Sequence, residues 1–137
     1  MTASQRSVAV GEAMTSRVRT ATPDESLPEI WLLLGQEGCH HVPIVDGGSP
    51  VGMVSSRDLV RLAHRKGASK LDARTLAGAT AADVMSTDLE TIDVDAPIED
   101  AIDRIGRGDI HALVVVDEGG ALVGIVTHND LLHYLIS

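Results

Sequence analysis

The chain has 137 residues, of which 44% are hydrophobic, and its 11 Lys and Arg against 20 Asp and Glu give a formal net charge of −9. This length suffices for one ordinary domain with a proper core, which excludes a disordered chain. The acidic balance and an aromatic content of 1% exclude a typical nucleic-acid-binding protein, because phosphate backbones need cations and bases need rings on which to stack.

The cysteine content and the apolar runs indicate the compartment. Cys39 is the only cysteine, which excludes an internal disulfide framework and fits a reducing environment. The N-terminal residues lack the apolar stretch of a signal peptide, and no later run approaches the roughly 20 residues of a membrane span. The sequence therefore predicts a soluble cytoplasmic protein without a membrane partner.

The sequence contains an internal repeat. Residues 10–48 align with residues 81–119 at an offset of 71, and after one inserted residue in a turn, residues 51–59 align with residues 123–131. The identical pairs include Met14 and Met85, Thr20 and Thr91, Asp24 and Asp95, His40 and His111, Gly52 and Gly124, and Asp58 and Asp130. The chain is therefore predicted to hold two copies of one structural unit.

The first copy spans residues 8–65 and follows a loose tail of residues 1–7. It begins with a short extended piece at residues 19–21. Ser26-Leu-Pro-Glu29 has capping-box spacing and opens an apolar stripe at i, i+3, i+4 and i+7, which predicts a helix. Two apolar runs around a Gly-rich turn predict a hairpin, and a closing helix follows. These predicted strands and the closing helix cover residues 42–45, 51–54 and 56–64.

A polar connector at residues 66–80, with one helical turn at 71–76, leads to the second copy at residues 81–137. The same signals recur there in the same order. Pro97 suits the first position of a helix whose apolar stripe begins at Ile98. The predicted strands cover residues 90–92, 113–116 and 122–126, and the closing helix covers residues 128–136.

Each copy is thus predicted to be a β-α-β-β-α unit, in which three strands carry two helices on one face. The other apolar face of such a sheet stays open, and one copy is too small to be comfortable alone. We therefore expect an α+β fold in which two βαββα repeats pack about a pseudo-two-fold axis.

Each copy ends its second hairpin strand with the same arrangement: Gly52-Met-Val-Ser55-Ser-Arg-Asp58 and Gly124-Ile-Val-Thr127-His-Asn-Asp130. A glycine permits close approach to the backbone, and a helix N-terminus with its unpaired N–H groups favours a phosphate. An Asp can accept hydrogen bonds from both hydroxyls of a ribose. Together these features favour a nucleotide site. The same Ser/Thr-x-x-Asp spacing is also that of a capping box, so a purely structural role for these residues is the alternative.

Residues 8–136 resemble a tandem pair of cystathionine-beta-synthase (CBS) domains, the arrangement called a Bateman module. The resemblance rests on a series of motifs that occur in the same order in both copies. They are Val10-Gly-Glu-Ala-Met14 and Ala82-Asp-Val-Met85, Thr20-x-x-x-Asp24 and Thr91-x-x-x-Asp95, His41-Val-Pro-Ile-Val-Asp46 and Leu113-Val-Val-Val-Asp117, and both glycine-to-aspartate segments.

The resemblance implies binding of adenosine-containing ligands in two clefts between the repeats. In the family, the Asp of one repeat holds the ribose, while the adenine lies against the first and second strands of the other. One implied cleft contains Asp130, Thr127, Thr20, Ala21 and Cys39, and the other contains Asp58, Ser55, Thr91, Ile92 and Ile110. Further residues expected near the ligand are Arg57, His40, His111, His128 and Asn129.

The cations of the sequence bear on the ligand. Many nucleotide-binding members of the family carry a His-Arg pair before the second strand, where this chain has His40-His41 and His111-Ala112. Arg57 is the remaining fixed cation for a phosphate, and the histidines contribute charge only near or below a pKa of about 6.5. We therefore expect AMP to be favoured over ATP, because a triphosphate needs several cationic donors. ADP is a further candidate ligand. S-adenosylmethionine, which is cationic, also suits the acidic chain.

The two clefts are predicted to be unequal. Ala21 of the first copy is replaced by the bulkier Ile92 in the second, and Thr22 by the acidic Asp93. These changes favour the cleft with Asp130 for adenine, whereas Arg57 favours the cleft with Asp58 for phosphate.

Other chemistry has little support in the sequence. There is no HExxH motif, and His40 and His41 point to opposite faces of a strand, so no metal site is expected. Cys39 and His40 diverge for the same reason, and no third orienting group is evident, so we expect no catalytic residues and no enzyme.

The function that follows is a stand-alone regulatory module that senses an adenosyl ligand and acts in trans on an unidentified protein. We expect it to form a homodimer through exposed helices. The alternative is a ligand-free interaction or dimerisation module, in which Asp58 and Asp130 only cap helices.

Overall fold

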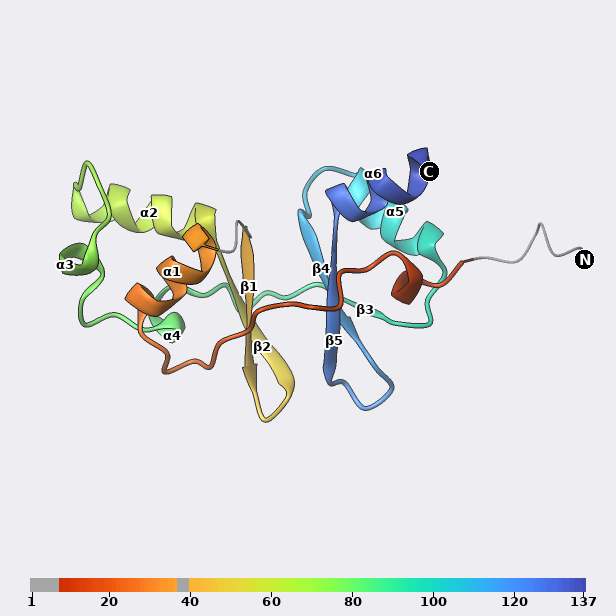
Figure 1. Ribbon diagram of the computed structural model, residues 1–137, viewed down its shortest axis with the longest axis horizontal. Helices are drawn as coiled ribbons and strands as arrows, with labels where there is room; N and C mark the ends of the chain where they lie inside the picture. Colours follow the sequence, from red (N-terminus) through yellow and green to blue (C-terminus); the bar gives the residue numbers. More distant parts are fainter. Residues whose placement is uncertain (1–7, 37–39) are drawn as a thin grey trace, which may run out of the picture. The chain divides into compact units, whose positions relative to one another are not determined.

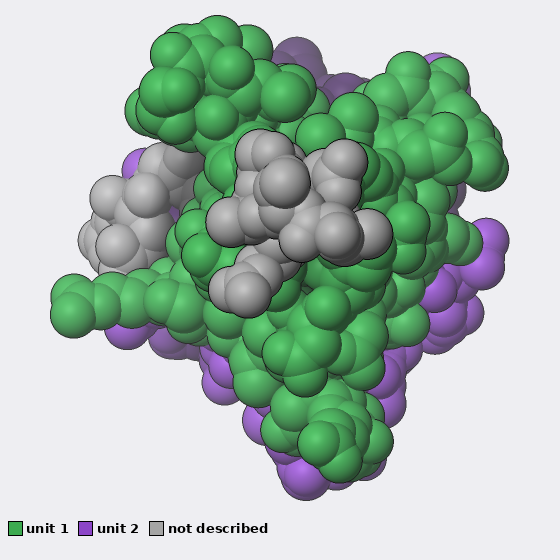
Figure 2. Space-filling view, turned by 90° about the vertical axis from the view of Figure 1, so that its right-hand side faces the viewer, with its two compact units in different colours: residues 1–18, 90–137 green, residues 19–89 purple. Residues whose placement is uncertain are grey.

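The computed structural model describes residues 8–36 and 40–137, which form two compact units. One unit consists of residues 19–89 and the other of residues 1–18 together with residues 90–137 (Figures 1 and 2). Cys39 lies outside the described residues. No helix within the two described ranges is both long enough and apolar enough to cross a membrane.

The unit of residues 19–89 is built on the first copy of the repeat (Figure 1). Its elements are α1 (Leu27–Gln36), β1 (His41–Asp46), β2 (Ser49–Ser55), α2 (Ser56–Lys66), α3 (Ala73–Leu76) and α4 (Ala81–Val84). The antiparallel pair β1 and β2 is joined at Gly47 and Gly48, whose φ angles are +61° and +86°. A two-residue hairpin turn of this kind needs positive φ at both positions, which explains the paired glycines.

The first strand predicted in this unit is reduced to a single bridge. Ala21 pairs in parallel with Ile44, and its N–H donates to the carbonyl of Pro43 at 3.1 Å. The expected extended strand at residues 19–21 is therefore wrong as a full strand, because only one residue pairs with the hairpin. α1 packs on β1, while α2 and α4 pack on β2, so the helical layer predicted over the hairpin is present. The core beneath it is aliphatic, as the composition requires.

The other unit contains the second copy. Its elements are β3 (Thr91–Asp93), α5 (Ile98–Gly106), β4 (Ala112–Val116), β5 (Leu122–Thr127) and α6 (His128–Ile136). β3 pairs in parallel with β4, and β4 pairs antiparallel with β5. Figure 1 shows α5 and α6 on one face of this sheet. Pro97 is the N-cap residue and not the first helical residue as predicted, a difference of one position.

The segment that precedes each copy in the sequence packs in the unit that contains the other copy. Val10, fully buried, belongs to the core of the second copy, and its N–H donates to the carbonyl of Ala96 at 2.8 Å. Ala81 stands at the equivalent position before the second copy, yet it lies fully buried in the core of the first. Its N–H donates to the carbonyl of Glu25 at 2.9 Å, the equivalent of Ala96. We call residues 8–18 and 81–89 the entry segments.

Truncation of Val10 tests this exchange. Val10→Ala removes two buried methyl groups and should lower the free energy of unfolding by about 2 kcal/mol. Amide hydrogen exchange should lose protection first in β4 and β5, although these strands lie about a hundred residues away in the sequence. Val60→Ala serves as the control, because the Val60 side chain is 68% exposed. A loss of protection confined to β1 and β2 would contradict the assignment.

Candidate functional site

Both candidate segments lie where the last strand of a hairpin runs into a helix, β2 into α2 and β5 into α6. Ser55 and Thr127 are the N-cap residues, with backbone angles φ −118°, ψ 166° and φ −120°, ψ 174°. Asp58 and Asp130 are the third residues of their helices. The duplicated sequence therefore produces nearly the same backbone twice.

Each aspartate turns one carboxylate oxygen back onto its N-cap. The Ser55 N–H and hydroxyl donate to Oδ2 of Asp58 at 2.7 and 3.1 Å. The Thr127 N–H and hydroxyl donate to Oδ2 of Asp130 at 2.9 and 3.2 Å. The capping boxes predicted from the spacing are present in both copies, and they stabilise the first turns of α2 and α6.

A third box of the same kind lies outside the predicted site. The Thr80 N–H and hydroxyl donate to Oδ2 of Asp83 at 2.8 and 3.3 Å, at the start of α4. Ser55-x-x-Asp58, Thr80-x-x-Asp83 and Thr127-x-x-Asp130 thus all form the same cap. Any ligand role of Asp58 and Asp130 has to come from their second carboxylate oxygen, Oδ1.

The surroundings of Oδ1 differ between the copies. Oδ1 of Asp130 accepts a hydrogen bond from the Thr15 hydroxyl at 2.8 Å. Oδ1 of Asp58 faces the guanidinium of Arg61, whose nitrogen is 3.5 Å away on a side chain that is 66% exposed. Asp58 is itself only 8% exposed. The two carboxylates therefore share their capping contacts and differ in their remaining contacts.

The glycines of the motif are explained by the entry segments. A Cβ at Gly52 would contact the Met85 side chain, lying 2.9 Å from its Cγ. A Cβ at Gly124 would lie 2.6 Å from Sδ of Met14 and 2.7 Å from the carbonyl oxygen of Thr15. The group that approaches each glycine is thus a methionine of the protein. The identity of Met14 and Met85 in the alignment is the sequence signal for this contact, although nothing in the local pattern joins these methionines to the glycines.

The other predicted residues of the first copy lie on several elements of their unit. Thr20 and His40 are exposed, and Arg57 is exposed on the first turn of α2. Ala21 is buried in the core of its unit.

The equivalent residues of the second copy follow the same pattern. Thr91 begins β3, His111 precedes β4, and both are exposed, as are His128 and Asn129 on the first turn of α6. Ile92 and Ile110 pack in the core of their unit. The difference in bulk between Ala21 and Ile92 is therefore taken up inside each unit.

The predicted clefts combine residues of both units. Each unit brings together its own Ser/Thr-x-x-Asp pair, whereas the pairing of Asp130 with Thr20 and of Asp58 with Thr91 stays a prediction. In the described part of the chain, no group of three or more His, Cys, Asp or Glu side chains could hold a metal ion.

The turns after Thr20 and Thr91 are closed by local hydrogen bonds. The Thr22 hydroxyl donates to Oδ1 of Asp24 at 2.6 Å, and this bond lowers the pKa of Asp24 below its ordinary value, with a smaller contribution from a backbone hydrogen bond. In the second copy, Asp93 instead accepts from the N–H of Asp95 at 2.8 Å. Asp93, which was expected to favour the cleft with Asp130 for adenine, thus has a structural partner in its own turn.

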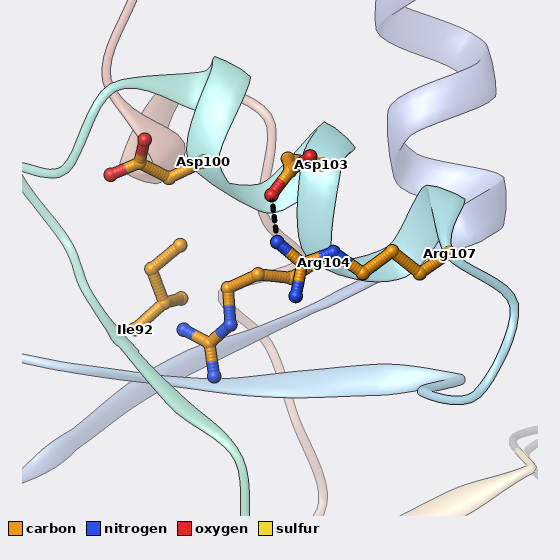
Figure 3. A pocket seen from close by; sticks show the side chains of 5 residues that line it. All are labelled: Ile92, Asp100, Asp103, Arg104 and Arg107. Atoms are coloured by element: carbon orange, nitrogen blue, oxygen red, sulfur yellow. Dashed lines mark hydrogen bonds and ion pairs between the residues drawn. The ribbon is translucent and has the colours of Figure 1, made fainter.

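A hollow of about 340 Å³ lies between β3 and α5 (Figure 3). It is lined by Ile92, Asp100, Asp103, Arg104 and Arg107. The Arg104 guanidinium donates to the carbonyl of Thr91 and to Oε1 of Glu90, both at 2.7 Å. Arg107 forms an ion pair with Asp103. Both arginines that line the hollow therefore have partners, and Arg104 ties α5 to the start of β3.

Comparison with known proteins gives a consistent result. The CBS domain model matches residues 10–65 and 81–137. An uncharacterized protein, MK0525, of Methanopyrus kandleri is 32% identical over 96% of this chain and 66% of its own length. The CBS domain-containing protein YhcV of Bacillus subtilis is 33% identical over 89% of this chain and 81% of its own length.

Solved structures resemble most of the chain. CBSX2, a CBS-pair protein from Arabidopsis thaliana, in its complex with AMP has a TM-score of 0.79 at 27% identity, covering 93% of this chain and 96% of that one. The CBS domain pair of protein MJ0100, in complex with 5′-methylthioadenosine and S-adenosyl-L-methionine, has a TM-score of 0.77 at 25% identity, covering 93% of this chain and 99% of that one.

The glycine contacts predict that the two copies respond differently to the same pair of substitutions. Gly52→Ala should destabilise the protein by about 1–3 kcal/mol through overpacking. Adding Met85→Ala should restore part of that loss, because the three atoms nearest to the new methyl group all belong to the Met85 side chain. Gly124→Ala should be restored less by Met14→Ala, because the Thr15 carbonyl remains 2.7 Å away.

Two double-mutant cycles measured by urea unfolding check this difference. Gly35→Ala is the control, since nothing lies within 4 Å of a Cβ at this helical position. Equal coupling energies in the two cycles would contradict the prediction.

Proposed function

Because the chain belongs to the CBS domain family, which it matches in two tandem segments, we propose that it is a regulatory module that binds an adenosine-containing ligand. The observation that carries this proposal is the duplicated Ser/Thr-x-x-Asp arrangement at the N-termini of α2 and α6. Two similar CBS pairs bind adenosyl compounds. MJ0100, at 25% identity, binds S-adenosyl-L-methionine and 5′-methylthioadenosine, and CBSX2, at 27% identity, binds AMP.

The chemistry of the two carboxylates suits a ribose. An ionised Asp has about four lone-pair positions, and capping uses those of Oδ2. Oδ1 is then the acceptor for the 2′ and 3′ hydroxyls of a ribose. In this proposal a single side chain therefore caps its helix and holds the sugar.

We favour AMP as the ligand, with S-adenosylmethionine as the alternative. Arg57, exposed on the first turn of α2, supplies a fixed positive charge beside Asp58. The histidines His40, His111 and His128 are exposed and add charge only when protonated. A net charge of −9 disfavours a triphosphate over a monophosphate and suits a cationic adenosyl compound.

A binding role also fits how the family segments fill the chain. They take up residues 10–65 and 81–137, and a ligand-sensing role is what the proposal gives to this pair. Binding in such a module changes the populations of its conformations, and a partner protein reads that change. We propose the cytoplasm as the compartment, in line with the single cysteine.

The first test is a thermal-shift panel with AMP, ADP, ATP and S-adenosylmethionine. A ligand at 100 times its Kd should add about 2.7 kcal/mol to the free energy of unfolding, which raises Tm by several degrees at this size. Asp58→Asn and Asp130→Asn should each reduce the shift, because the charged acceptor of the ribose hydroxyls is lost.

Asp83→Asn is the matched control for this panel. It weakens a capping box of the same kind outside the proposed site, so it should lower Tm slightly without altering the ligand-induced shift. Absence of a shift with every adenosyl compound would instead favour the ligand-free interaction module, in which all three aspartates are only caps.

Exposed apolar side chains support a homodimer as part of the proposal. Leu132, Leu135 and Ile136 form one face of α6 and are 52%, 58% and 73% exposed, and Trp31 on α1 is 40% exposed. Large apolar side chains that gather on one exposed helix face are typical of an interface between proteins.

Sedimentation velocity tests the dimer. Leu135→Glu should weaken self-association at least tenfold, because it places a charge within the apolar face. His133→Glu, on the same helix, adds a charge without removing an apolar side chain and should have little effect. A wild-type chain that stays monomeric at high micromolar concentration would contradict the dimer.

A further inference from the structure

The two carboxylates of the proposed site meet different residues of the entry segments. Thr15 and Ser86 occupy equivalent positions, and each forms an antiparallel bridge to the residue after a motif glycine, Ile125 and Met53 respectively. The paired backbone hydrogen bonds are 2.8 and 3.0 Å long at Thr15 and 2.9 and 3.0 Å long at Ser86. The backbone frame is therefore the same in both units.

The side chains on this frame behave differently. The Thr15 hydroxyl donates to Oδ1 of Asp130 at 2.8 Å. Among the described residues, the Ser86 hydroxyl forms no side-chain hydrogen bond, and Oδ1 of Asp58 has the exposed guanidinium of Arg61 at 3.5 Å. Both hydroxyl residues could donate, yet only the threonine does.

This difference decides how much of each carboxylate a ribose can use. Asp130 accepts three hydrogen bonds from the protein, two on Oδ2 and one on Oδ1. A diol needs two acceptor positions, so it has to displace the Thr15 hydroxyl from Asp130. Oδ1 of Asp58 accepts no hydrogen bond from another described residue, and its charged neighbour is the exposed Arg61 side chain at 3.5 Å.

We propose that Thr15 is an affinity determinant that makes the two binding positions unequal, so that Asp58 binds the ribose more tightly than Asp130. The proposal rests on the proposed function. The sequence difference between Ala21 and Ile92 favoured the cleft with Asp130, and this proposal instead gives Asp58 the higher affinity. The entry segment, through Thr15, then competes with the ligand for Asp130.

The experiment is isothermal titration of the full chain with AMP, with S-adenosylmethionine in a parallel arm. Asp58→Asn and Asp130→Asn assign the binding events. The tighter event should disappear in Asp58→Asn. Thr15→Val keeps the β-branched shape and removes the hydroxyl, and it should tighten the Asp130 event about ten- to a hundredfold, which is the expected effect of removing one competing hydrogen bond to a charged group.

Thr15→Ser retains a hydroxyl and is the matched control, expected to bind within about twofold of the wild type. Thermal unfolding of each variant confirms that it folds. A tighter event that disappears in Asp130→Asn, or a Thr15→Val chain with unchanged affinities, would overturn the inference while leaving the proposed function intact. Absence of binding by both probes in the wild type and in Thr15→Val would overturn both.

Discussion

The structure depends on the exchange of the entry segments between the two copies of the repeat. Val10 closes the core of the second copy, and Ala81 closes the core of the first, each with backbone hydrogen bonds to equivalent carbonyls. A single copy with its own preceding segment would therefore leave its core open. The duplication is not two domains in series, because each compact unit needs chain from both halves of the sequence.

The same exchange shapes the candidate site. The entry segments bring Met14 and Met85 against Gly124 and Gly52. These glycines suggest close approach of a ligand, but the packing of the methionines already requires them. Likewise, the aspartates are already required as caps. Structural and binding roles do not compete here, since a carboxylate has two oxygens and the cap uses only one of them. The proposed ligand position is thus built from residues that the fold needs anyway.

Much of this fold could be predicted because its signals are local. Apolar periodicity and paired glycines located the hairpins and helices, and residues 128–136 form the predicted closing helix. The exchange could not be predicted, since nothing in the local pattern says which sheet residue 10 or residue 81 joins. The length of the first strand was overestimated for a similar reason. Residues 19–21 have an extended pattern, but tertiary contacts decide how many of them pair with β1, and only Ala21 does. At the site, the capping boxes followed from the Ser/Thr-x-x-Asp spacing. The different contacts of Thr15 and Ser86 could not be predicted, because both residues carry a hydroxyl and the sequence does not show which one reaches a carboxylate.

A duplicated backbone of this kind allows the two positions to differ in their side-chain contacts with little loss of stability. The N-cap angles of α2 and α6 agree within about ten degrees, so substitutions on the frame alter contacts without altering the backbone. Thr15 against Ser86, Thr22 against Asp93 and Arg57 against Asn129 are changes of this type. Two identical positions would fill together over one concentration range, whereas positions of different affinity respond over two. Since a ligand shifts an equilibrium only by its differential affinity, the inequality of the positions, more than their presence, would determine what such a module can report.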